Sequence, residues 1–178
     1  MRIISGTHKG RRILPPKNLP VRPTTDMSKE SLFNILQNRC DYQDLKVLDL
    51  FAGTGNISYE FGSRGAAKIV AVDADFGCTK FIKQTAESFD FPIFVIKSNV
   101  FSFLEKNNEH FDVIFADPPY SFSETELQKL ITLIFNNQWL QADGLLILEH
   151  TRHIKTENWT HFSFQKNYGQ SVFSFFEF

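Results

Sequence analysis

The sequence predicts an α/β fold built on one mostly parallel sheet with helices on both faces. Short apolar runs alternate with helical segments from residue 46 onward, a pattern typical of parallel strands buried on both faces. Polar residues and glycines follow these runs at Asp49, Gly53, Asp73, Asn99 and Asp117. Because ligands of such sheets bind beyond the carboxyl ends of the strands, we expect one binding site at that edge.

The chain of 178 residues fits one main domain preceded by a short arm. We place the arm at residues 1–25 and the main domain at residues 26–178. The arm is expected to form a β-hairpin, with strands at residues 2–5 and 11–14 around a turn bounded by Gly6 and Gly10. Four prolines between residues 15 and 23 then make a stiff connector.

A helix is predicted to follow the connector, with Thr25 or Asp26 as its N-cap. Both side chains can accept a hydrogen bond from the first unpaired N–H groups of the helix. Helical spacing predicts an apolar face made of Met27, Ser31, Leu32, Ile35 and Leu36.

The elements of the main domain are expected to follow in alternation. Strands are predicted at residues 47–50, 69–72, 92–96, 113–116 and 145–148, with helices at 56–63, 76–89, 101–106 and after Ser123. Asp75 is the predicted cap of the second of these helices, and Ser123 with Glu126 forms a capping box for the last. Aromatic segments at 161–166 and 171–178, joined through Tyr168-Gly169, predict a C-terminal antiparallel hairpin.

Residues 47–56 combine a strand, a glycine turn and a helix start, with Phe51 inside the turn. Gly53 and Gly55 let the backbone turn tightly and approach a ligand. Ser58 stands where a dinucleotide-binding motif has its third glycine, which argues against a diphosphate. Asp49 suits a cationic ammonium group. These features favour S-adenosylmethionine over a nicotinamide cofactor, and a structural turn with a capping Asp49 is the alternative.

Two further positions are expected to hold the adenosine part of that cofactor. Asp73 ends the second strand about 20 residues after the glycine turn, where an acidic side chain accepts hydrogen bonds from ribose hydroxyls. Asn99 and Val100 follow the third strand, where an amide and a backbone N–H can read the adenine edge. Asn99 can equally cap its own helix, so both interpretations stay open.

Asp117-Pro118-Pro119-Tyr120 is the predicted catalytic motif. An exocyclic amino nitrogen of a base is a poor nucleophile, because its lone pair is delocalised into the ring. Acceptors at Asp117 Oδ and the Pro118 carbonyl can hold its two hydrogens and favour the pyramidal geometry needed for attack. The two prolines lock the loop and remove its N–H donors, and the Tyr120 ring offers a surface on which an extruded base can stack. An ordinary turn after a strand is the alternative for the motif alone.

The sequence resembles the RsmD family of small-subunit ribosomal RNA guanine-N2 methyltransferases. The likeness is carried by residues 2–6 and 9–11, by residues 22–26 with Glu30, Leu32, Phe33 and Asn34, by residues 48–55 and 117–120, and by Tyr168-Gly169. The first two stretches are the more specific, since the cofactor and catalytic motifs occur in many amino-methyltransferases. Lys29 and Ser171 depart mildly from the pattern, where an arginine and a threonine are expected.

The resemblance implies a class I methyltransferase fold, which is Rossmann-like with a mostly parallel seven-stranded sheet. It implies methylation of guanine N2 in 16S ribosomal RNA, within a 30S subunit or an assembly intermediate, and no metal ion. It also brings Thr25, with Thr24 and Asp26, towards the cofactor.

The charge distribution fits a polyanionic partner. All six charged side chains before Asp26 are basic, histidine aside, so this segment carries +6 and leaves −7 for the remainder of a chain with net charge −1. A solvated terminus with unpaired charges is the alternative. We expect RNA phosphates to be contacted by Arg2, Lys9, Arg11, Arg12 and Arg22. Such contacts position a substrate without reading its sequence.

Three other functions fit parts of the pattern. A DNA adenine-N6 methyltransferase also uses Asp-Pro-Pro-Tyr, but 178 residues leave no separate target-recognition domain. A non-catalytic ribosome-assembly module would not need Asp117, and an oxidoreductase would need the missing third glycine. No apolar run is long enough to cross a bilayer, and two cysteines suggest neither a disulfide framework nor a metal site, so a cytoplasmic protein is expected.

Overall fold

The computed structural model describes residues 1–17, 19, 26–106, 109–169 and 171–178. Its helices are α1 (Asp26–Gln37), α2 (Asn56–Arg64), α3 (Phe76–Phe89), α4 (Val100–Leu104) and α5 (Glu124–Asn136). Its strands are β1 (Lys46–Leu50), β2 (Lys68–Asp73), β3 (Ile93–Lys97), β4 (Phe111–Ala116), β5 (Leu140–Thr151), β6 (Phe162–Tyr168) and β7 (Ser171–Phe176). Three residues predicted to take part in the site, Arg22, Thr24 and Thr25, lie outside the described residues.

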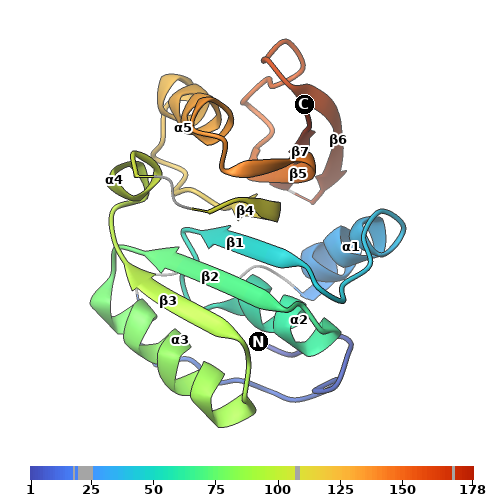
Figure 1. Ribbon diagram of the computed structural model, residues 1–178, viewed down its shortest axis with the longest axis vertical. Coiled ribbons are helices and arrows are strands. Elements are labelled where there is room, and N and C mark those ends of the chain that lie inside the picture. The colour runs from blue at the N-terminus through green and yellow to red at the C-terminus, as the bar shows by residue number, and fades with distance from the viewer. Residues whose placement is uncertain (18, 20–25, 107–108, 170) are drawn as a thin grey trace.

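The seven strands form one sheet in the order β3-β2-β1-β4-β5-β7-β6 (Figure 1). Strands β1 to β5 run parallel, and β7 is antiparallel to both β5 and β6. The predicted parallel sheet with a C-terminal antiparallel hairpin is therefore confirmed. The order reverses at β1, which lies between β2 and β4, and a reversal of this kind opens a crevice at the carboxyl ends of the strands.

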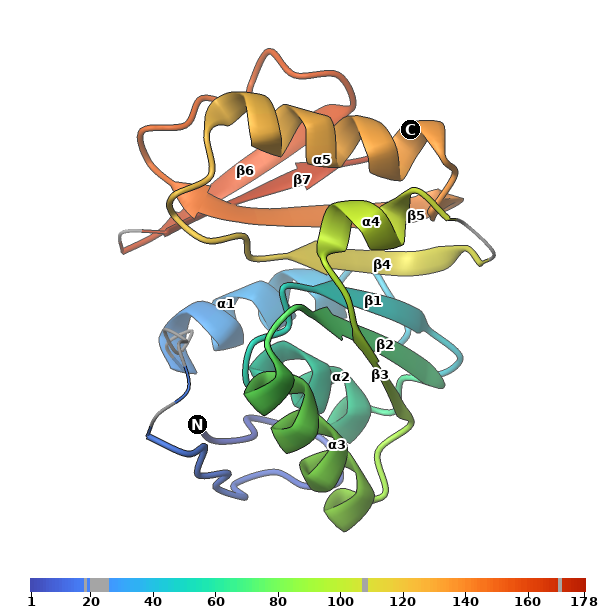
Figure 2. The ribbon, with the colours of Figure 1, turned by 90° about the vertical axis from the view of Figure 1, so that its left-hand side faces the viewer.

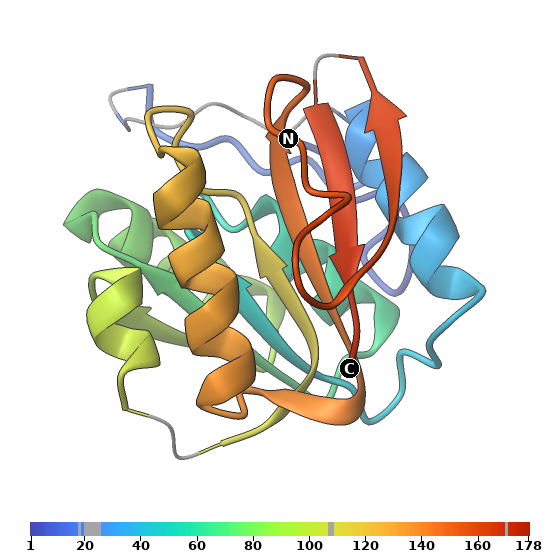
Figure 3. The same ribbon diagram turned by 90° about the horizontal axis from the view of Figure 1, so that it is seen from above.

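Helices cover both faces of the sheet (Figure 3). α4 and α5 pack on one face, against the strand residues Leu48 and Leu50 among others. α1 and α2 pack on the opposite face against Val47 and Phe115, and α3 lies on that face against Ala71. Successive strand residues point to opposite faces, so a sheet covered twice needs continuous apolar runs. None of the helices in the described part of the chain is long and apolar enough to cross a membrane.

The predicted elements of the main domain agree with the structure to within about two residues, apart from β5. Asp75 caps α3, and Ser123 with Glu126 forms the predicted capping box of α5. β5 starts earlier than predicted, because Leu140 already pairs with Phe111 of β4. An irregular stretch follows, and regular pairing with β4 resumes at Leu145. Gln141, Asp143 and Gly144 in that stretch interrupt the apolar run and concealed the start of the strand.

The buried face of α1 agrees with the prediction at Leu32 and Leu36 and differs from it elsewhere. Met27 is 74% exposed, and the buried side chains are Lys29, Leu32, Phe33 and Leu36. Lys29 is only 1% exposed, because its ammonium group has partners in the arm and in α2. The prediction treated Lys29 as a solvent-exposed residue because lysine is rarely buried. It therefore chose Met27 and Ser31 for the buried face and left out Lys29 and Phe33.

The two segments of the arm pair antiparallel with each other, as the predicted hairpin requires. An isolated bridge joins Arg2 and Arg12, and backbone hydrogen bonds on either side of it link Met1 with Ile13 and Ile3 with Arg11. Beyond it, the backbone N–H groups of Ile4, Ser5 and Thr7 donate to α2 rather than to the opposite segment. The predicted hairpin is therefore present but shorter, because docking on α2 takes up the N–H groups that follow Ile3. Figure 2 shows the arm next to α2 and α3.

Candidate active site

A cavity of about 540 Å³ lies at the carboxyl edge of the sheet. This volume is in the range typical of small-molecule sites. Its lining includes the whole predicted catalytic motif, Asp117 to Tyr120, and most of the predicted cofactor residues: Asp49, Phe51, Gly53, Asp73, Asn99 and Val100. Of the predicted cofactor residues that the structure describes, only Gly55 is absent from this lining.

The glycine turn after β1 holds three residues in the left-handed backbone region, with φ of 61° at Phe51, 54° at Gly53 and 81° at Gly55. A phenylalanine rarely adopts this conformation, so the surroundings of Phe51 must hold it there. A Cβ added at Gly55 would lie 2.7 Å from the ring of Tyr59. The absence of a side chain at Gly55 therefore makes room for Tyr59, and an approach of Gly55 to the cofactor stays a prediction.

Asp49 is buried at the centre of the site. Its Oδ2 accepts hydrogen bonds from Ser58 N at 3.1 Å and Ser58 Oγ at 2.5 Å. Burial raises the pKa of Asp49 to about 7, although the hydrogen bonds from Ser58 act in the opposite direction. A cationic group in the cavity would compensate the lost solvation of the carboxylate, and the ammonium of S-adenosylmethionine is such a group.

Asp73 is fixed by two backbone donors. Its Oδ2 accepts from Gly53 N and its Oδ1 from Asp75 N, both at 2.8 Å. A carboxylate has about four acceptor positions, so each oxygen retains capacity for a ribose hydroxyl. Asp75 caps α3 through Cys78 N, as predicted, which leaves Asp73 at the cavity.

Asn99 caps its own helix. Its Oδ1 accepts from Phe101 N at 2.9 Å and from Ser102 N at 3.3 Å, so the alternative interpretation of this residue is the one that the structure shows. Asn99 and Val100 still line the cavity. A contact between these two residues and adenine stays a prediction.

The catalytic loop is joined to the cofactor turn by backbone and aromatic contacts. Asp117 N donates to Leu50 O at 3.4 Å, which ties the end of β4 to the end of β1. Phe122 packs edge-on against Phe51, with 5.4 Å between ring centroids, and stacks on Phe101 at 6.0 Å. Tyr120 is 50% exposed at the cavity. The predicted catalytic loop and the predicted cofactor turn are thus packed against each other.

Comparison with known proteins agrees with this geometry. Residues 1–177 match the family described as Conserved hypothetical protein 95. The chain belongs to this family. Its relatives include proteins named Ribosomal RNA small subunit methyltransferase D from Haemophilus influenzae, 34% identical over 168 residues, and from Escherichia coli, 35% identical over 150 residues. The alignments cover 90% of this chain and 85% of the first relative, and 84% and 74% for the second. The resemblance to the RsmD family is confirmed.

Solved structures show the same fold. The Escherichia coli protein yhhF matches with a TM-score of 0.85 and 30% identity, over 99% of this chain and 96% of that chain. The Thermus thermophilus 16S rRNA N2 G1207 methyltransferase RsmC, solved with AdoMet and guanosine, matches with a TM-score of 0.71 and 20% identity, over 89% of this chain and 45% of that chain. This RsmD-family chain therefore has the class I methyltransferase fold, and S-adenosylmethionine is its cofactor.

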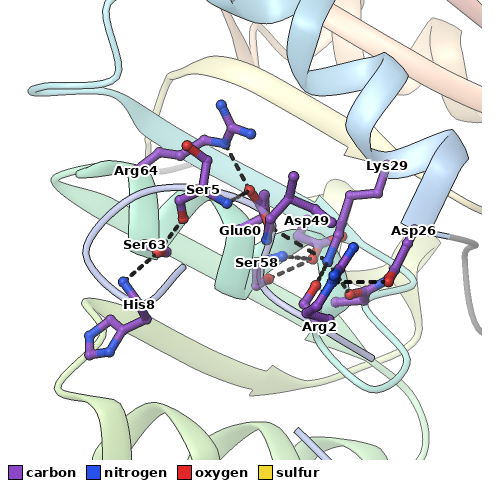
Figure 4. A network of polar contacts seen from close by, with 12 residues as sticks. Arg2, Ser5, His8, Asp26, Lys29, Asp49, Ser58, Glu60, Ser63 and Arg64 are labelled. Carbon is purple, nitrogen blue, oxygen red and sulfur yellow. Dashed lines mark hydrogen bonds and ion pairs between the residues drawn. The ribbon is translucent and has the colours of Figure 1, made fainter. Parts of the chain in front are cut away.

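The arm of this RsmD-family chain is anchored through a buried carboxylate on α2 (Figure 4). Glu60 is fully buried and accepts from Ile4 N at 2.8 Å and Ser5 N at 3.0 Å. Arg64 Nε lies 2.9 Å and Lys29 Nζ 3.5 Å from the same carboxylate. Two cations and two backbone N–H groups thus stabilise the buried Glu60 carboxylate. Without such partners, burial of this charge would be energetically costly.

Lys29 is also linked to the cavity through Asn56. Its Nζ donates to Arg2 O at 2.6 Å and to Asn56 Oδ1 at 2.8 Å, and Asn56 lines the cavity. Burial lowers the pKa of Lys29, and the nearby Glu60 carboxylate opposes that shift. The resemblance led us to expect an arginine at this position; the lysine that stands here bridges the arm, α1 and α2.

The predicted RNA-binding residues lie on the outer side of the arm. Lys9, Arg11 and Arg12 are exposed, whereas Ile3 and Ile13 are buried against the domain. Arg2 forms an ion pair with Asp26, with 3.5 Å between Nε and Oδ2, so part of its charge is already engaged. Phosphate contacts by Arg2, Lys9, Arg11 and Arg12 stay predictions, and Arg22 lies outside the described residues.

The predicted site residues did not include several polar residues that line the cavity, among them Ser28, Thr54, Asn56, Glu149 and Ser171. Glu149 follows the fifth apolar run directly, as Asp117 follows the fourth, so the rule that identified Asp117 also applies to it. No motif pointed to Ser28. Ser171 was noted as the start of the last hairpin strand and as a departure from the family pattern, without a role in the site.

Proposed function

We propose that this chain transfers the methyl group of S-adenosylmethionine to the exocyclic N2 of a guanine in 16S ribosomal RNA, as part of a 30S subunit or an assembly intermediate, in the cytoplasm. The single observation that supports this most is the shared cavity. Cofactor residues from β1 and β2 and the Asp-Pro-Pro-Tyr loop from β4 face the same space. The relatives named Ribosomal RNA small subunit methyltransferase D support the choice of RNA.

The cofactor supplies an electrophilic methyl group on a sulfonium. The chain has to hold it: Asp49 accepts from the ammonium, Asp73 from the ribose, and the glycine turn at Gly53 lets the backbone approach. The raised pKa of Asp49 supports this assignment, because a buried carboxyl gains most from a cationic ligand.

The catalytic loop is proposed to orient the amino nitrogen. Asp117 and the Pro118 carbonyl accept its two hydrogens, which directs the lone pair towards the methyl group. Tyr120, exposed at the cavity, stacks on the extruded base. The alkylated amine is acidic enough to lose its proton without a strong base, so alignment is the main task of the loop.

The test uses 30S particles from cells that lack this protein, duplex DNA, and labelled cofactor. We expect label in the particles, at one guanosine that mass spectrometry identifies as N2-methylated. Asp117→Ala should lose this activity and retain affinity for S-adenosylhomocysteine. Label in DNA alone would contradict the substrate, and full activity of Asp117→Ala would contradict the assigned motif.

A further inference from the structure

Glu149 is a buried acidic residue of the cavity for which the proposed reaction has no use so far. It directly follows Leu148 in β5, is 5% exposed, and lines the cavity together with Asp117. A carboxylate held in a cavity rather than in solvent is energetically costly, which makes a role in ligand recognition worth testing.

The sheet register places Glu149 beside Asp117. Ala116 of β4 is paired with Leu148 of β5, so the next residue of each strand stands at the same level. Neighbouring strands are about 4.8 Å apart. Two residues earlier on the same face, Phe115 is paired with Ile147. Asp117 and Glu149 are therefore neighbours along the carboxyl edge of the sheet, and both line the cavity.

The order of the strands separates a cofactor side from a substrate side. Asn99, Asp73 and Asp49 belong to β3, β2 and β1 or to the turns after them, on one side of β4. Glu149 comes from β5, on the other side of β4. A base held by the loop after β4 thus has the cofactor residues on one side and Glu149 on the other.

We infer that Glu149 selects guanine by accepting a hydrogen bond from its N1–H, while Asp117 holds the N2 amino group. This inference rests on the proposed function. Guanine carries two adjacent donors, N1–H and N2–H, and two adjacent carboxylates complement them. Adenine carries an acceptor at N1 beside its amino group, so the same pair of carboxylates would face a lone pair and disfavour it.

The experiment uses the guanosine mapped in the 30S particle. This guanosine is replaced by 2-aminopurine, which keeps the 2-amino group but has an acceptor at N1. The replacement is made by ligating a synthetic oligonucleotide into 16S ribosomal RNA before the particle is reconstituted. Single-turnover methylation rates are measured for the original chain and for Glu149→Gln, whose amide can accept from N1–H or donate to N1. Asp143→Asn, an exposed carboxylate of the same strand, is the matched control.

We expect the original chain and Asp143→Asn to methylate guanosine roughly 10- to 100-fold faster than 2-aminopurine, as expected for one hydrogen bond to a charged group. Glu149→Gln should slow guanosine methylation and reduce this ratio to a few-fold, with unchanged affinity for S-adenosylhomocysteine. An unchanged ratio in Glu149→Gln would overturn the inference, because a purely structural role slows both bases equally. If the original chain modifies no guanosine at all, it is the proposed function that has failed.

Discussion

At the scale of single residues, the site depends on carboxylates whose environments differ. Asp49 is 1% exposed and its pKa is raised to about 7 by burial, whereas Asp73 is held by backbone donors at the mouth of the glycine turn. A buried carboxyl at the cofactor position remains partly protonated near neutral pH in the free protein. Binding of a cation would favour its ionised form, so binding and protonation are linked.

This linkage predicts that the affinity for S-adenosylhomocysteine decreases as the pH is lowered. Only the ionised Asp49 attracts the ammonium, and one pH unit below a pKa of about 7 roughly a tenth of the carboxyl is ionised. Calorimetric titration should therefore show roughly tenfold weaker binding at pH 6 than at pH 8. Asp49→Asn should bind weakly at both pH values.

The variant also serves as a folding control for this prediction. The folded pKa of Asp49 is raised, so its contribution to stability is largest at low pH and is lost as pH rises through about 7. Asp49→Asn removes that loss, and its melting temperature at pH 8 should equal or exceed that of the original chain. A pH-independent affinity in the original chain would contradict the ammonium assignment.

At the scale of elements, α2 connects the arm to the cofactor site. Its Ser58 binds Asp49, its Glu60 binds the arm, and its Ser63 accepts from the arm through both backbone and side chain. Gly6 makes the closest approach, since a Cβ there would lie 1.7 Å from Ser63 O. The arm is thus built onto the same helix that begins at the glycine turn.

This close approach predicts different effects for two glycines of the arm. Gly6 and Gly10 both have φ of +82°, but a Cβ at Gly10 would meet nothing within 4 Å. Gly10→Ala should cost about 1 kcal/mol of the free energy of unfolding, from backbone strain alone. Gly6→Ala should cost at least about 2 kcal/mol more, because the hydrogen bonds of Thr7 and His8 to Ser63 are also lost.

Urea denaturation of the two variants measures this difference. Thr7 N donates to Ser63 O at 2.7 Å and His8 N to Ser63 Oγ at 3.0 Å, so the loss at Gly6 has identified contacts behind it. Equal losses for Gly6→Ala and Gly10→Ala would show that the arm adjusts without leaving α2, and would contradict the tight docking.

At the scale of the whole molecule, charge is unevenly distributed between a basic arm and an acidic main domain. Lys9, Arg11 and Arg12 are exposed on that arm. Changing Arg11 and Arg12 to Gln should weaken binding of 30S particles and reduce the slope of log affinity against log salt by about 2, with cofactor affinity nearly unchanged. A Lys155→Gln and Lys166→Gln double variant removes the same charge from exposed positions elsewhere and should leave the slope unchanged.

Filter binding across a salt series provides the measurement. Both double variants change the net charge equally, so a difference between them reports the location of the charge. Equal slopes for the two variants would mean that RNA is held elsewhere, and a loss of cofactor affinity with the arm variant would indicate a structural role for Arg11 and Arg12.

The sequence predicted the strands, the caps and the catalytic loop of this fold, because each depends on local patterns such as apolar runs, Asp75 and Ser123. It predicted the hairpin of the arm and the burial of Leu32 and Leu36. It did not predict the docking of the arm on α2 or the burial of Lys29, because both depend on contacts with Glu60, which is distant in the chain. Glu149 could have been found from its place after an apolar run. Its position beside Asp117 needed the register of β4 and β5.

The most direct test of the central claim is a crystal structure of the chain with S-adenosylhomocysteine. The account predicts the amino group of the ligand at Asp49, the ribose at Asp73, and the sulfur facing Asp117 and Pro118 with space for a planar base between them. A ligand whose sulfur points away from the Asp117 loop, or a loop that closes against it without that space, would contradict the account.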